Sequence, residues 1–113
     1  MTRPVRIQLS RRAGFNLQAT SRAANGLPAL SVARPGRYGN PFPVGRAGPL
    51  GRIAPDKLGA VGFFDAMLDD PDLREAAGYP ADLEPLRGYN LGCWCGEREA
   101  CHADVILRRL YGE

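Results

Sequence analysis

The last quarter of the chain constrains the fold most, because an apolar segment, a short turn and an amphipathic helix follow one another there. Residues 89–94 are apolar and aromatic and predict a central strand. A helix is predicted to begin at Cys101 or His102, and its apolar positions are Val105, Ile106, Leu107 and Leu110. All three cysteines and the only histidine lie where these two elements meet, within residues 93–102. Because thiols and imidazole bind soft metals, attack electrophiles and move protons near neutral pH, we expect the chemistry at this junction.

The rest of the chain alternates short strands and helices between turns rich in Gly and Pro. In chain order, the patterns predict a strand at 5–9, a short helix or loop at 16–25, a strand at 30–33, a helix at 55–68, a second short helix after Pro71 and a helical turn at 82–86. We expect the helix at 55–68 to pack on the sheet through Val61, Phe64 and Leu68. A length of 113 residues is that of a single domain. We therefore expect one α/β domain over residues 1–113, a sandwich with a central, mostly parallel or mixed sheet and flanking helices.

Composition and charge narrow the class of protein. The net charge is +3, which permits a phosphate-bearing partner without requiring one. The apolar runs are short, so we expect no signal peptide, no transmembrane segment and no membrane partner. An odd number of clustered cysteines is not typical of a disulfide framework. These features predict a reduced, cytoplasmic protein.

The first candidate site is the pair Cys93 and Cys95 followed by Cys101 and His102. Three cysteines and one histidine are a valid set of zinc ligands, and three thiolates can also hold an iron–sulfur cluster with one iron left open. The spacing is unusual for zinc, because C-x-C on a strand puts both thiols on one face without the tight turn of a zinc knuckle. Zinc and an iron–sulfur cluster are thus the two candidate cofactors.

A second interpretation of the same residues needs no metal. The start of a helix stabilises a thiolate or an anion, so Cys101 can act as a nucleophile and His102 as an acid or base, with Asp104 beside them. We favour this interpretation slightly, because of the C-x-C spacing. The alternative without chemistry is that the cysteines are small buried apolar residues and Asp104 serves only the end of the helix.

The second candidate site is the loop from Arg34 to Phe42. Arg34 and Arg37 flank it like a clamp for phosphate or carboxylate, and Tyr38 offers a face on which a planar group can stack. Gly39 permits close approach of the backbone, and Asn40 before a proline favours a turn that its amide can hold. Taken alone, the same composition also describes an ordinary loop with solvated arginines.

Three segments together resemble a known family: Arg6–Ser10, Val32–Phe42, and Leu91–Cys95 with Cys101–Val105. The family comprises small uncharacterised domains of bacteria and phages, with the hallmarks R-P-x-x-[WY]-G-N-P-F and C-[WFY]-C…C-H-[AG]-D-V. The resemblance covers nearly the whole chain, and Tyr38 stands where the family often has Trp. It implies no reaction. It does imply that the two motifs form one functional site, made of Arg34, Arg37, Gly39, Asn40, Pro41, Cys93, Cys95, Cys101, His102 and Asp104.

Two functions of different class follow from these residues. The first is an enzyme or ligand-binding domain for a nucleotide or a nucleic-acid end, with both motifs at the carboxyl end of the central strand. The alternative is a zinc-stabilised module that binds nucleic acid without catalysis, through a basic face of Arg3, Arg6, Arg11, Arg12 and the loop arginines. A third interpretation is a small interaction protein that has no binding or catalytic site.

Overall fold

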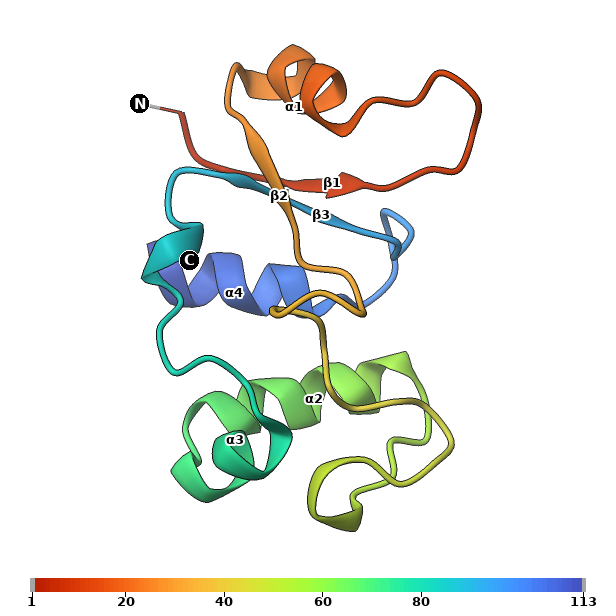
Figure 1. Cartoon of the computed structure of the whole chain (residues 1–113), viewed down its shortest axis with the longest axis vertical. Coiled ribbons are helices and arrows are strands. Elements are labelled where there is room, and N and C mark those ends of the chain that lie inside the picture. The colour runs from red at the N-terminus through yellow and green to blue at the C-terminus, as the bar shows by residue number, and fades with distance from the viewer. Residues whose placement is uncertain (1, 113) are drawn as a thin grey trace.

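A parallel three-stranded sheet organises the domain, as the computed structural model of the chain shows for residues 2–112 (Figure 1). Its strands are β1 (Arg6–Gln8), β2 (Ala29–Ser31) and β3 (Asn90–Cys93), in the order β1-β3-β2. Both pairings are parallel, and Leu91 of β3 lies opposite Arg6 on one side and Leu30 on the other. The predicted α/β class and the central position of the third strand are both confirmed.

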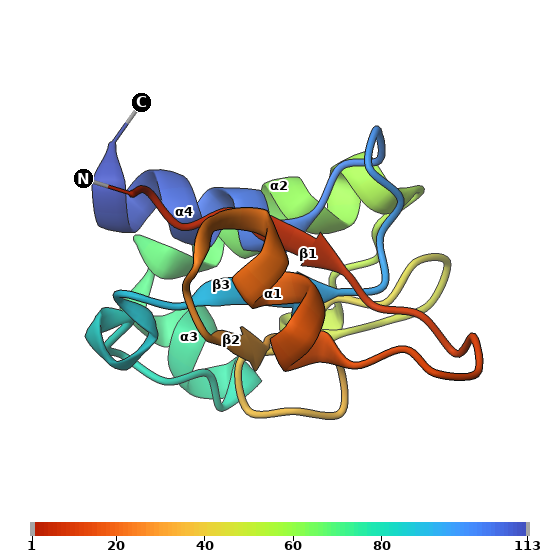
Figure 2. The same ribbon diagram turned by 90° about the horizontal axis from the view of Figure 1, so that it is seen from above.

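Helices cover both faces of the sheet (Figures 1 and 2). The helix α1 (Leu17–Asn25) lies on one face, and α4 (His102–Tyr111) lies on the other. Beyond α4 lie α2 (Lys57–Leu68) and α3 (Pro71–Ala77). The layers are therefore α1, the sheet, α4, and the pair α2 and α3. Short 3₁₀ turns occupy Pro49–Gly51 and Glu84–Leu86.

The position of α2 corrects one expectation from the sequence. The apolar positions of this helix predict that it packs on the sheet, but it packs against α4 and α3, because α4 already occupies that face. Phe64 is fully buried, as expected, while Val61 and Leu68 are only half-buried against the core. A helix that packs on a helix shows the same apolar spacing as one that packs on a sheet, so the sequence alone does not distinguish them.

Local signals account for where the helices begin. The side chains of Asn16 and Asp56 accept hydrogen bonds from backbone N–H groups of the first turn of α1 and α2, at 3.0 and 2.7 Å. Asp70 does the same for α3. Cys101 is the N-cap of α4 and makes no side-chain cap, which leaves its thiol free for other contacts.

The apolar core lies between the sheet, α4 and α2, and its largest fully buried side chains include Phe42, Phe64, Met67, Leu91 and Ile106. On the other face, Gly92 of β3 lets α1 approach closely. A Cβ atom at this position would lie 3.0 Å from the Leu9 side chain and 3.3 Å from that of Leu17. The absence of a side chain at Gly92 thus allows helices to cover both faces of a very short strand.

All three strands point the same way, so the segments that leave their carboxyl ends gather at one edge of the sheet. Cys93 ends β3 there, and the loop that follows β2 runs beside it. No helix within residues 2–112 is long and apolar enough to cross a membrane.

Candidate functional site

The three cysteines meet at the carboxyl edge of the sheet. Cys93 is the last residue of β3, Cys95 follows in the turn, and Cys101 caps α4. The three Sγ atoms lie within 4.8 Å of one another, and those of Cys93 and Cys95 are 3.6 Å apart. Cys93 and Cys101 are buried, Cys95 is half-buried, and all three are free thiols. Residues from a strand end and a helix start thus converge on one point.

Hydrogen bonding and burial make one thiol of the cluster more acidic than an ordinary cysteine and the other two less acidic. The hydrogen bond with Cys93 lowers the pKa of Cys101, and hydrogen bonds with His102 and Arg6 lower it further, against the effect of burial. The same bond, together with burial, raises the pKa of Cys93. The pKa of Cys95 is also raised, mainly because the thiol is partly buried. Among the three thiols, Cys101 is therefore the one that most readily loses its proton.

A pocket of about 240 Å³ opens over the cluster, slightly below the usual range of about 300–1,000 Å³ for small-molecule sites. Its walls come from the end of β3, the loop after β2, the first half of α2 and the start of α4. The lining residues are Ala33, Arg34, Asn40, Val44, Lys57, Ala60, Val61, Cys93, Trp94, Cys95, Ala100, Cys101 and His102. The structure therefore brings the two sequence motifs together in one cavity.

His102 is held by backbone carbonyl groups. Its Nε2 lies 2.8 Å from the carbonyl oxygen of Val32 and 3.1 Å from that of Tyr38. Because carbonyl oxygens only accept hydrogen bonds, Nε2 carries the proton and donates to both. The ring is buried and packs edge-on against Phe64, at 5.1 Å between centroids. His102 thus fastens the loop after β2 to α4 through its Nε2.

The loop from Arg34 to Phe42, which was predicted to bind an anion, contributes some of its residues to the pocket and others to the exposed surface. Arg34 lines the pocket, and so does Asn40, whose amide donates to the Ala60 carbonyl and accepts from the Phe42 backbone. Gly39 is required by packing, because a Cβ there would lie 3.0 Å from both N and Cα of Arg34. Arg37 is exposed and lies outside the pocket lining.

Two further predicted residues also lie outside the pocket. The ring of Tyr38 packs edge-on against Tyr79, at 6.0 Å, and its hydroxyl donates to the Asp82 carbonyl. Asp104 is exposed on α4, with its Oδ1 3.7 Å from Nε of Arg6. In this arrangement Tyr38 provides packing, and Asp104 forms a loose ion pair.

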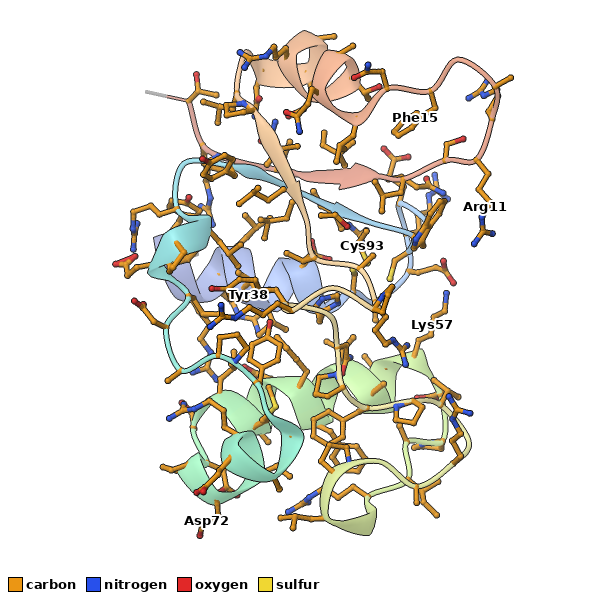
Figure 3. All side chains as sticks on the ribbon, in the orientation of Figure 1. Arg11, Phe15, Tyr38, Lys57, Asp72 and Cys93 are labelled. Atoms are coloured by element: carbon orange, nitrogen blue, oxygen red, sulfur yellow. The ribbon has the colours of Figure 1, made fainter. Side chains whose placement is uncertain are left out.

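The structure adds two residues to the pocket, Trp94 and Lys57, and a third beside the cysteine turn, Arg6, none of which the sequence assigned to this site. Trp94 lines it with 43% of its surface exposed, and the Arg11 guanidinium lies 4.7 Å from the centre of its ring. Lys57, at the start of α2 (Figure 3), lines the same pocket. Its ammonium group pairs with Glu99 at 2.6 Å. Arg6 donates to the carbonyl oxygens of the cysteine turn, at Gly96, Glu97 and Glu99.

The sequence could have indicated only one of these three residues. Trp94 stands between two cysteines, and this position could have marked it as a wall of the site. Lys57 and Arg6 are distant in sequence from both motifs, and no local pattern distinguishes them from solvated charges. Their roles depend on how α2 and β1 pack beside the cysteine turn.

The fold and the pocket define a class: a small α/β domain with a three-cysteine pocket at the carboxyl edge of a parallel sheet. Within it, the chain belongs to the family described as a domain of unknown function, DUF4326, which matches residues 15–112. The expected resemblance to such a family is thereby confirmed. Neither a curated protein nor a solved structure matches the chain.

Proposed function

We propose that this domain binds a small phosphate-bearing molecule, a nucleotide or the end of a nucleic acid, and acts on it as an enzyme or enzyme-like binder. One observation carries the proposal: the Arg34 and Lys57 side chains and the three thiols line a single pocket. Cations supply the contacts that a phosphate needs, and the cysteine cluster supplies reactive or metal-ligating groups beside it.

Arg34 is the stronger of the two cations for this purpose. No hydrogen bond or ion pair joins its guanidinium to another residue within 2–112, so its donors are available to a ligand. A guanidinium can hold two phosphate oxygens at once through parallel N–H groups. Lys57 already pairs with Glu99, but an ammonium group has three donors and can bind a second anion. Trp94 offers a partly exposed ring for a planar base.

The remaining pocket residues shape the cavity. Asn40 and His102 make hydrogen bonds to backbone groups of the loop and of α2, and these bonds hold the walls of the pocket in place. Arg34 and Lys57 contact the ligand, whereas Arg37 and Tyr38 lie outside the pocket and do not.

Isothermal titration calorimetry with inorganic phosphate and with adenosine monophosphate tests the proposal. Arg34→Ala should weaken binding of both about tenfold or more, the loss of a charged hydrogen bond of roughly 1.5–3 kcal/mol. Arg37→Ala is the matched control, because it removes the same charge from the same loop outside the pocket, and it should change affinity less than about twofold. Equal losses in both variants, or no binding by the wild type, would contradict the proposal.

An exposed aromatic ring favours a second candidate, the nucleic-acid-binding module. Trp94 under Arg11 resembles the stacking platforms that hold single-stranded bases. Fluorescence titration with a single-stranded oligonucleotide, with and without a terminal phosphate, distinguishes this module from the phosphate-binding domain proposed above. Binding that depends on Trp94 but not on the phosphate or Arg34 would favour the module.

The cellular setting belongs to the same proposal. The three thiols are free, which agrees with a reducing, cytoplasmic compartment. The resemblance of the two motifs suggests a bacterial or phage protein.

A further inference from the structure

We propose that Cys93, Cys95 and Cys101 together bind one zinc ion, and that the fourth coordination position of this ion opens into the pocket. The proposal concerns the cysteine cluster alone. It does not depend on the phosphate-bearing ligand proposed above.

The separation of the sulfur atoms matches a single ion. A tetrahedral zinc with Zn–S bonds of about 2.3 Å holds neighbouring sulfur atoms about 3.8 Å apart. Here all three Sγ atoms lie within 4.8 Å of one another, with the closest pair at 3.6 Å. Adjustments of about 1 Å, within reach of χ1 rotations, complete the site. The geometry thus favours the metal alternative for these thiols over the metal-free one.

The same distances disfavour an iron–sulfur cluster. In a four-iron cluster with one open iron, each of the three thiolates binds a different iron, so the cysteine sulfur atoms stand further apart than around one ion. Thiolate ligands select zinc among the common divalent ions, because zinc is softer than the cations that carboxylates bind.

Secondary structure holds the ligands before any ion arrives. Cys93 lies on β3, where it pairs with Gln8 of β1, and Cys101 caps α4. The turn between them is fixed by the Arg6 guanidinium, which donates to three of its backbone carbonyl groups. A ligand set supplied by a strand end and a helix start is more rigid than one supplied by a free loop.

Nearby charges suit a site with three thiolates. Three thiolates and one divalent zinc carry a net charge of about −1. The Arg6 guanidinium makes a hydrogen bond to Cys101, and Lys57 reaches the same pocket from α2. These cations offset the surplus negative charge without occupying a coordination position, as an outer shell does in protein zinc sites.

The fourth position is left to water or a ligand. His102 adjoins Cys101 in sequence, but it does not belong to the group of ligand atoms within 4.8 Å of one another in residues 2–112. Its Nε2 is occupied by the carbonyl groups of Val32 and Tyr38. All three cysteines line the pocket, so the open side of the cluster faces its cavity. Three protein ligands and one open position are typical of catalytic rather than structural zinc sites.

Elemental analysis of untagged protein, purified without added metal or chelator, tests the site directly. We expect about one zinc ion per chain. Cobalt(II) added to the metal-free protein should produce the charge-transfer absorption of a thiolate-bound ion. Iodoacetamide should modify the thiols slowly in the zinc-loaded protein and at least about tenfold faster after a chelator is added.

Variants locate the ion. Cys95→Ser is the main test, because Cys95 is half-buried and its loss should leave the fold measurable by circular dichroism. It should reduce zinc to below about a tenth of an ion per chain in folded protein. Asp104→Asn changes the nearby exposed carboxylate of α4 and should retain full zinc. Cys101→Ser should also lose the ion, and its circular dichroism reports whether it folds.

Four results would overturn the proposal. One is folded wild-type protein that takes up neither zinc nor cobalt. Another is iron with acid-labile sulfide in place of zinc. The third is a mass two hydrogens low, which shows a disulfide in the cluster. The last is full zinc content in folded Cys95→Ser. Because none of these measurements uses a phosphate ligand, failure here is distinct from failure of the proposed function.

Discussion

At Gly39 the space beside the backbone is too small for a methyl group. A Cβ atom there would lie 2.8 Å from Cγ of Arg34 and 3.0 Å from its N and Cα, and a backbone cannot move aside as a flexible side chain can. We expect Gly39→Ala to destabilise the protein by about 1–3 kcal/mol, measured by urea denaturation, and to weaken phosphate binding through Arg34.

Gly62 provides the matched control for that substitution. It is exposed within α2, and a Cβ there meets no atom within 4 Å. Gly62→Ala should stabilise the protein by about 0.5–1 kcal/mol, because alanine loses less backbone entropy in a helix. If both alanines had the same effect, close packing at Gly39 would not be the cause.

The imidazole of His102 serves two buried carbonyl groups at once. His102→Ala leaves the oxygens of Val32 and Tyr38 without their donor and removes a ring that packs against Phe64. We expect a loss of about 2–4 kcal/mol in the free energy of unfolding. Asp104→Asn, two residues along α4 and exposed, should cost less than about 1 kcal/mol. An unchanged melting temperature in His102→Ala would instead indicate a purely chemical role.

At the scale of elements, Phe64 joins α2 to α4. It is fully buried and makes edge-on contacts with Tyr79, at 5.2 Å, and with His102. Phe64→Ala should cost about 3–5 kcal/mol in chemical denaturation. Leu58→Ala, on the same helix but 71% exposed, should cost less than about 1 kcal/mol. A small effect at Phe64 would mean that the inner face of α2 is not packed as described.

The predicted elements were mostly found where their patterns were local. Asn16, Asp56 and Asp70 cap the helices that follow them, and a cap is recognised within four residues of sequence. The packing partner of α2 was not recognised, because the periodicity of a helix shows which face is buried but not what covers it.

Across the whole molecule, the layers stack along the 40 Å axis, and the outermost helical layer is tied to α4 by Arg109 (Figure 1). The Arg109 guanidinium binds Asp65 of α2 at 2.6 Å and Asp69, just after α2, at 2.7 Å. Arg108 of α4 adds a longer contact to Asp65, at 3.6 Å, and apolar packing, including that of Phe64, joins the same two layers.

This link predicts how stability changes in acid. The hydrogen bond from Arg109 holds the pKa of Asp69 below its ordinary value of 3.8. A lowered folded pKa gives stability that is present above the unfolded pKa and lost as pH falls through the folded one. Asp69→Asn should therefore lower the urea midpoint at pH 6, and the difference from wild type should shrink below about pH 4. The exposed carboxylate of Glu75 on α3 supplies the control Glu75→Gln, whose difference from wild type should be smaller at pH 6. A difference for Asp69→Asn that stays constant down to pH 2 would contradict the ion pair.

The sequence by itself determined the strand at 90–93, the helix at 102–111 and the placement of every cysteine at the junction between them. Apolar periodicity, caps and turn residues act over a few neighbours, so they can be interpreted without a fold. Only the tertiary structure decided which residues share the pocket. It brought Arg34, Lys57 and Trp94 to the cysteines, placed Arg37, Tyr38 and Asp104 elsewhere, and committed Nε2 of His102 to two carbonyl groups. These outcomes depend on the direction of side chains and the packing of distant segments, which local patterns do not encode.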